Sequence, residues 1–210
     1  RLFDVIRIDH FRGLESYWAI PYGDKTARGG KWVKGPGHDF VRAMQERFPD
    51  LRLIAEDLGF LTDDVIRLQK DSGWPGMKVP EFAFDSREPS NYLPHRYIRN
   101  CICYSGTHDN ETLAQWLAQT SETARAYAAE YLGLTEQEGY AWGILRSGLA
   151  SVADTFIAQL QDYLGLGAEA RMNTPGTLSD RNWSWRLQPG LLTAELAHRL
   201  RRMNTMYERL

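Results

Sequence analysis

Short apolar runs that alternate with longer amphipathic stretches are the feature that most constrains the fold of this chain. Residues 5–9 and 51–56 are apolar runs of strand length. Residues 38–48 carry apolar side chains at helical spacing and stop before Pro49, which cannot continue a helix. Because helices that connect parallel strands produce this alternation, the sequence predicts an α/β fold built from β/α units.

The same pattern continues to the end of the chain. The predicted strands are residues 5–9, 51–56, 77–84, 102–107 and 155–160. Helices are predicted at residues 38–48, 123–132 and 140–149, between Thr62 and Gly73, and from a start near Asn110 and Glu111. A last helix is predicted from Leu191 to the end of the chain. Its apolar stripe consists of Leu192, Leu196, Leu200, Met203 and Tyr207. A long loop rich in glycine, proline and aromatic residues is predicted between the first strand and the first helix.

Five strands of this kind suit part of a (β/α)8 barrel, which takes about 250 residues when complete. The 210 residues are few for a whole barrel with loops this long, and the sequence does not begin with Met. We therefore expect a piece of a larger protein.

Charge and composition exclude several classes of partner. The formal net charge is -2, with 25 Lys and Arg against 27 Asp and Glu, and no basic cluster occurs. Such a chain lacks the basic patch that binds nucleic acid or an anionic membrane. No apolar run approaches the roughly 20 residues needed to cross a bilayer. We expect neither nucleic acid nor a membrane as partner.

The two cysteines, Cys101 and Cys103, lie two residues apart in one predicted strand. Side chains at this spacing point to the same face of a strand and rarely form a disulfide. The start of the chain lacks the basic and then apolar pattern of a secretion signal. The expected compartment is therefore the reducing cytoplasm.

Three predicted strands end in a carboxylate set among polar residues, namely Asp9, Glu56 and Asp109. Catalytic groups of barrels lie at the carboxyl ends of strands, so three such acids are expected to converge on one pocket. Each acid alone is also explained as a loop or helix-cap residue.

The neighbours of the first two acids suggest different roles for them. Arg7 shares a strand face with Asp9, and a fixed positive charge keeps a carboxylate ionised, as a nucleophile requires. A structural salt bridge explains the same spacing. Glu56 follows an apolar run, where desolvation raises a carboxyl pKa and favours a general acid. A pair of carboxyl groups, one with a low pKa and one with a raised pKa, is typical of enzymes that cleave glycosidic bonds.

Groups suited to sugar binding accompany the third acid. His108 and Asn110 flank Asp109 and supply donors and acceptors for sugar hydroxyls. Aromatic side chains, on whose faces sugars stack, are frequent outside the apolar runs. These aromatic residues are Tyr17, Trp18, Tyr22, Trp32, Trp74, Trp183 and Trp185. Packing in the core or at an interface is the alternative, and it is the one expected for at least half of them. The five histidines show no spacing typical of metal ligands on a helix, so we expect no metal and no catalytic cofactor.

Several motifs together resemble the amylomaltase, or 4-alpha-glucanotransferase, family of disproportionating enzymes. They are RIDHFRG (7–13), GKWVKGPG (30–37), IAEDLG (54–59), PGMKV (75–79), GTHDNET (106–112), RMNTPGT (171–177) and NWSWR (182–186). They occur in family order and span nearly the whole chain. The resemblance implies the C-terminal part of a TIM barrel, about strands 4 to 8, over residues 1–210, with the N-terminal part of the barrel absent.

The resemblance also implies roles for the site residues. Asp9 would be the nucleophile, Glu56 the general acid/base and Asp109 an acid that stabilises the transition state. Arg7 and His108 would hold the nucleophile and the sugar at the cleavage subsite. Near the glucan path it places Asn173, Trp183 and Arg186. The implied substrates are maltooligosaccharides or other α-1,4-glucans.

Two alternatives to a glucan transferase remain at this stage. An α-glucan hydrolase of the amylase clan would use the same pair of carboxylates. The other alternative is a non-catalytic glycan-binding module, or a part that is inactive without the missing half of the barrel.

Overall fold

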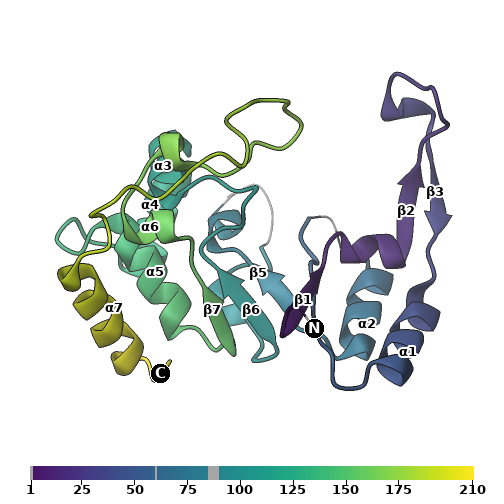
Figure 1. The fold of residues 1–210 in the computed structure, drawn as a ribbon, viewed down its shortest axis with the longest axis horizontal. Coiled ribbons are helices and arrows are strands. Elements are labelled where there is room, and N and C mark those ends of the chain that lie inside the picture. Colours follow the sequence, from purple (N-terminus) through teal and green to yellow (C-terminus); the bar gives the residue numbers. More distant parts are fainter. Residues whose placement is uncertain (1, 60, 85–89) are drawn as a thin grey trace. The chain divides into compact units, whose positions relative to one another are not determined.

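The computed structural model describes residues 2–59, 61–84 and 90–210, shown as a ribbon in Figure 1. The chain divides into two compact units, Arg1–Met77 and Lys78–Leu210. Each unit has a hydrophobic core of its own. Strands and helices alternate through both, which confirms the predicted α/β class.

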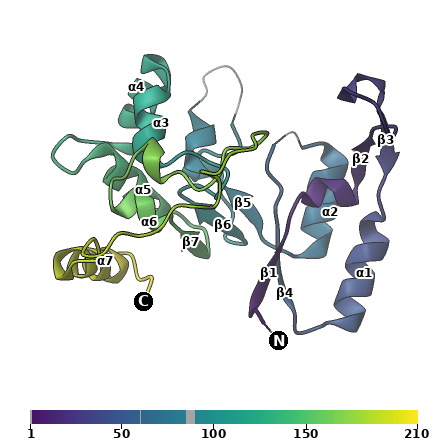
Figure 2. The same cartoon turned by 45° about the horizontal axis from the view of Figure 1, so that its top comes forward.

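The first unit is built on two parallel strands. β1 (Val5–Ile8) pairs with β4 (Arg52–Ala55), and the register places Ile8 opposite Ala55. Helices α1 (Gly37–Arg47) and α2 (Asp63–Ser72) lie side by side next to this pair in Figures 1 and 2. Their apolar faces enclose a core of buried residues, which are Phe11, Val41, Leu53, Ala55, Leu68 and Trp74.

Both ends of α2 agree with the sequence prediction. The Thr62 hydroxyl accepts a hydrogen bond from the Val65 amide and so satisfies a free N–H of the first turn. Gly73 ends the helix with φ 69°, a left-handed conformation that favours glycine. These boundaries were predictable because caps act through residues only a few positions apart.

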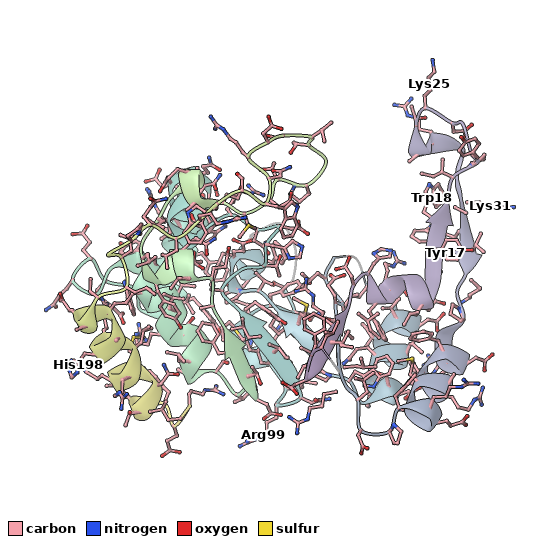
Figure 3. All side chains as sticks on the ribbon, viewed as in Figure 1. Tyr17, Trp18, Lys25, Lys31, Arg99 and His198 are labelled. Carbon is pink, nitrogen blue, oxygen red and sulfur yellow. The ribbon has the colours of Figure 1, made fainter. Side chains whose placement is uncertain are left out.

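The predicted loop between the first strand and the first helix is wrong in part. Residues Ser16–Ala19 (β2) and Lys31–Lys34 (β3) form an antiparallel hairpin, in which Trp18 lies opposite Trp32. Figure 3 shows Tyr17 and Trp18 on β2, Lys31 on β3, and Lys25 near the tip. Aromatic and β-branched residues favour strands, but the two short runs are separated by many polar residues. Their pairing therefore gives only a weak signal in the sequence.

The second unit contains two parallel strands and five helices. β6 (Cys101–Tyr104) pairs in parallel with β7 (Thr155–Ile157) in a sheet of order β5-β6-β7. The division between the two units falls within β5 (Gly76–Lys78). The helices are α3 (Leu113–Gln119), α4 (Glu122–Leu132), α5 (Tyr140–Ala150), α6 (Leu160–Tyr163) and α7 (Ala194–Met206). Packing of α3, α4 and α5 buries Leu113, Ala128 and Leu145.

Several predicted boundaries in this unit need correction. The run 77–84 is a strand only to Lys78, because Pro80 lacks an N–H for a strand ladder and opens a 3₁₀ turn to Ala83. The run 155–160 ends as a strand at Ile157, and α6 begins at Leu160. The helix predicted from Asn110 begins at Leu113, behind the cap residue Thr112.

The last helix is also shorter than predicted. α7 begins behind the cap residue Thr193, so Leu192 lies outside it. Leu196, Leu200, Met203 and Tyr207 of the predicted stripe are half-buried.

Two further expectations concern the chain as a whole. Cys101 and Cys103 are both buried, and no disulfide joins them, as predicted. Among the described residues, no helix is long and apolar enough to cross a membrane.

A fully buried carboxylate, Asp162, ties the end of β6 to the start of α3. Its Oδ2 accepts from the Ser105 hydroxyl at 2.5 Å, and its Oδ1 accepts from the Leu113 amide at 2.7 Å. Burial raises the pKa of Asp162 to about 6, although both hydrogen bonds favour the charged form. The carboxylate replaces water as the partner of two buried donors.

We expect Asp162→Ala to lower the free energy of unfolding by roughly 3 kcal/mol, because it leaves buried donors without an acceptor. Urea unfolding at pH 8 measures this loss. Asp154→Ala, at an exposed position next to β7, is the matched control and should change stability little. Equal effects of the two substitutions would contradict the structural role of Asp162.

Candidate functional site

The first unit brings Asp9 and Glu56 to the same end of two paired strands. The register of β1 and β4 ends with Ile8 opposite Ala55, so the next residue of each strand leaves the sheet at the same edge. Two backbone hydrogen bonds continue the connection beyond the strands. The Glu56 amide donates to the Ile8 carbonyl at 2.9 Å, and the Phe11 amide donates to the Glu56 carbonyl at 2.9 Å.

The backbone turn at His10 fixes the Glu56 carboxylate. His10 has φ 48° and ψ 50°, a left-handed conformation that is uncommon for residues other than glycine. In this conformation its amide donates to Glu56 Oε2 at 2.7 Å, while the Leu58 amide donates to Oε1 at 3.1 Å. Strained backbone of this kind occurs most often at functional sites. Both oxygens of Glu56 are therefore held by backbone donors.

Burial raises the pKa of Glu56 above the usual value for a glutamate, as predicted from the sequence. The charge of Asp9 raises it further, whereas the amide hydrogen bonds from His10 and Leu58 and the charge of Arg7 lower it. Arg7, Asp9 and Glu56 thus form one electrostatic group. We call Asp9 and Glu56 the strand-end acid pair. A carboxyl whose pKa is raised retains a proton at higher pH than an ordinary one and can act as a general acid.

In the second unit, Asp109 lies in a tight turn after β6. The Asn110 Oδ1 accepts from the amide and the hydroxyl of Thr107, each at 2.8 Å, and the Thr107 hydroxyl accepts from the Asp109 amide at 3.3 Å. We call residues 107–110 the Asp109 turn. The Asp109 side chain is exposed, and its Oδ2 lies 3.3 Å from His108 Nε2.

A later segment of the chain completes the surroundings of Asp109. Asn173 Nδ2 donates to Asp109 Oδ1 at 2.6 Å, and Arg171 Nη2 donates to the Asp109 carbonyl at 2.8 Å. The Trp183 ring lies 4.9 Å from the His108 ring. Trp183 has φ 63°, and its amide donates to the Met172 carbonyl at 2.7 Å. Of the sequence-predicted residues, His108, Asp109, Asn110, Asn173 and Trp183 therefore lie together.

Arg186 is held by its local backbone. Its guanidinium donates to the carbonyls of Trp183 and Trp185 at 3.3 Å and 2.8 Å. The side chain is exposed. Arg186 thus supports the backbone beside Trp183.

Two charged residues of this unit were missed by the sequence analysis. Arg171 lies within a quoted motif, and it bridges Glu111, at 3.3 Å, to the backbone of Asp109. Glu81 follows Pro80 in a segment predicted to be a strand, and its burial gave no signal in the sequence. Arg171 could have been predicted as a site residue because it lies in the motif of residues 171–177. The burial of Glu81 could not, because it depends on tertiary packing.

The aromatic side chains divide between surface and core. Tyr17, Trp18, Tyr22 and Trp32 of the hairpin segment and Trp183 of the second unit are exposed. Trp74 is instead buried and packs edge-on against Phe11, with ring centres 6.2 Å apart. A sugar cannot stack on a ring inside a core, so core packing, the alternative given for these residues, is the one that holds for Trp74.

The hairpin aromatics form a small cluster of their own. Trp18 packs edge-on against Trp32, with ring centres 5.4 Å apart, and its indole N–H donates to the Ala27 carbonyl at 2.8 Å. The Arg12 guanidinium lies over the Trp32 ring at 4.4 Å. These contacts fix the indoles on the hairpin. In the described part of the chain, no group of three or more His, Cys, Asp or Glu side chains is placed to hold a metal.

Known proteins resemble the chain along its whole length. A sequence profile described as 4-alpha-glucanotransferase matches residues 1–193. The 4-alpha-glucanotransferase of Clostridium butyricum is 48% identical over 210 residues, covering 100% of this chain and 43% of that protein. The 4-alpha-glucanotransferase of Streptococcus pneumoniae is 44% identical over 211 residues, covering 100% of this chain and 42% of that protein.

Solved structures show the same likeness. The amylomaltase of Streptococcus agalactiae, solved in complex with acarbose, matches with a TM-score of 0.93 and 38% identity over 98% of this chain and 42% of that one. The chain thus spans about two fifths of the length of the relatives that it matches, 43% and 42% for the two named above.

The charges around Glu56 lead to a test of the strand-end acid pair. We expect Asp9→Asn to lower the pKa of Glu56, because it removes a nearby negative charge, and Arg7→Met to raise it. The titration of the Glu56 side-chain carboxyl carbon by NMR measures both shifts. Asp50→Asn, in an exposed turn of the same unit, should leave the titration unchanged. Identical titrations in all four proteins would contradict the electrostatic group.

Proposed function

The chain belongs to the 4-alpha-glucanotransferase family, and from this premise we propose that it transfers α-1,4-glucan segments between maltooligosaccharides. The observation that supports this best is the strand-end acid pair. Asp9 and Glu56 leave one sheet edge together, and Glu56 has a raised pKa and two backbone donors on its oxygens. Retaining transfer needs one carboxylate as nucleophile and another carboxyl group as acid and base.

In the proposed mechanism, the Asp9 carboxylate attacks the anomeric carbon of a glucan. The glycosidic C–O bond breaks, and Glu56 gives its proton to the leaving oxygen, so a covalent glucosyl-Asp9 ester forms. The Glu56 carboxylate then removes the proton from the 4-hydroxyl of an incoming glucan, whose oxygen displaces Asp9. The number of glycosidic bonds is unchanged by the cycle. Transfer exceeds hydrolysis where the acceptor site excludes water.

Roles for the remaining site residues are part of the same proposal. Arg7 holds the nucleophile at the cleavage subsite, and Asp109 stabilises positive charge on the sugar in the transition state. His108, Asn110, Asn173, Trp183 and Arg186 form or support sugar-binding contacts. The contact of Asn173 with Asp109 and the position of the Trp183 ring beside His108 support these assignments. No cofactor is required by this mechanism.

The proposed architecture is the C-terminal part of a (β/α)8 barrel, about strands 4 to 8, which the rest of the protein completes. Parallel pairing of β1 with β4 and of β6 with β7 supports it. Val5 and Ile6 of β1 are 43% and 41% exposed, whereas strands in a parallel sheet are normally covered on both faces. We propose a reducing, cytoplasmic location, which the absence of a disulfide between Cys101 and Cys103 supports.

Incubation of the chain with pure maltotriose tests the transferase. We expect glucose and longer maltooligosaccharides to accumulate while total reducing ends stay constant. Asp9→Asn should reduce the rate about 10³-fold or more, and Glu56→Gln by about 10²-fold to 10⁴-fold, because each removes a reacting group. Asp50→Asn and Glu46→Gln, both at exposed positions of the same unit, are the matched controls.

The other outcomes separate the alternatives. A steady rise in reducing ends would identify an α-glucan hydrolase instead. An unchanged trimer, with maltooligosaccharide binding detected by tryptophan fluorescence, would contradict turnover by this chain and favour a glycan-binding part.

A further inference from the structure

Glu81 is a buried carboxyl group that the proposed reaction does not use. It lies in the 3₁₀ turn Pro80–Ala83 and is only 8% exposed. Its Oε1 accepts a hydrogen bond from Asn110 Nδ2. Its Oε2 is buried without a hydrogen-bond partner in the described part of the chain. A buried carboxylate oxygen without a donor is costly, so this environment favours the neutral acid.

The orientation of Asn110 explains why Glu81 is needed. Asn110 Oδ1 accepts hydrogen bonds from both the backbone amide and the hydroxyl of Thr107. The backbone amide of Asn110 donates to the Thr107 carbonyl at 3.1 Å. The oxygen of the Asn110 side chain is therefore committed to the Asp109 turn, and its NH₂ group must point away from that turn. Glu81 supplies the acceptor on that side. A side chain without an acceptor there would leave the donor unsatisfied.

The surroundings of Glu81 on balance oppose its ionisation. Burial is the main cause, and the carboxylates of Glu111 and Asp162 add to it, so the pKa of Glu81 rises to about 8. The hydrogen bond from Asn110 and the charge of Arg171 act in the opposite direction. Arg171 is already paired with Glu111 at 3.3 Å. An ionised Glu81 would therefore place an unpaired charge beneath the Asp109 turn.

We infer that Glu81 is a positioning residue of the proposed reaction. As a neutral acid, Glu81 holds the side-chain NH₂ group of Asn110 and thereby fixes the Asp109 turn. Ionisation of Glu81 loosens this turn, because Oε2 then draws in water or moves away from Asn110. The role in catalysis rests on the proposed function. The coupling between Glu81 and the turn rests only on contacts inside the second unit.

Backbone amide signals of residues 107–110, followed by NMR from pH 5.5 to 9.5, test the coupling. In the wild-type chain we expect these signals to shift with a midpoint near pH 8, the pKa of about 8 that burial gives Glu81. Glu81→Gln keeps the acceptor and cannot ionise, so the transition should be lost. Glu56→Gln and Glu130→Gln should retain it, the second because Glu130 is exposed on α4. A wild-type chain without the transition, or a transition that persists in Glu81→Gln, would overturn the inference.

Turnover of maltotriose at pH 6.5 tests the positioning role. We expect Glu81→Leu, which has no acceptor, to lower kcat about 10-fold to 100-fold with a smaller change in KM, since a misplaced group costs up to about 10²-fold. Glu81→Gln should rescue most of this loss. A folded Glu81→Leu variant with wild-type kcat would contradict a positioning role. A wild-type chain that shifts its amides but leaves maltotriose unchanged would contradict the proposed function and leave the coupling established.

Discussion

The parallel register of β1 and β4 is the constraint on which the chemistry of the first unit depends. Because Ile8 lies opposite Ala55, Asp9 and Glu56 emerge at one edge. A shift by one residue would turn every side chain of a strand to the opposite face. The left-handed turn at His10 then directs its backbone N–H to Glu56. The raised pKa of this glutamate follows from the register, through burial and the nearby charge of Asp9.

The second unit uses buried carboxyl groups to organise its backbone. Asp162 accepts from Ser105 and Leu113 at the two ends of the segment that joins β6 to α3. Glu81 accepts from Asn110 within the same segment. The exposed acid, Asp109, is thus supported by two acids that are themselves removed from water. Hydrogen bonds to buried acceptors fix a loop more firmly than contacts with water, because their loss leaves buried donors unsatisfied.

Membership in the 4-alpha-glucanotransferase family agrees with what the motifs indicated. The motifs before residue 60 lie in the same unit as the strand-end acid pair, and those after residue 105 lie in the same unit as the Asp109 turn. Sequence reasoning anticipated the raised pKa of Glu56, the absence of a disulfide between Cys101 and Cys103, and the caps of α2. It was wrong about the β2–β3 hairpin, which depends on strand pairing. For Trp74 the structure selects core packing over sugar stacking, two readings that the sequence left open. Which aromatic side chains are exposed and which are buried could not be predicted from their positions in the sequence.

The sequence by itself determined the alternation of strands and helices, the boundaries of helices such as α2, α4 and α5, and the acids at the strand ends. These features depend on periodicity and on caps that act over a few residues, so local order encodes them. Only the tertiary structure decided which side chains meet. His10 and Glu56 are 46 residues apart, Asp109 and Asn173 are 64 apart, and Glu81 reaches Asn110 across 29 residues. The burial that raises the pKa of Glu81 is created by this packing, since desolvation depends on every element around a group and not on its neighbours in the chain.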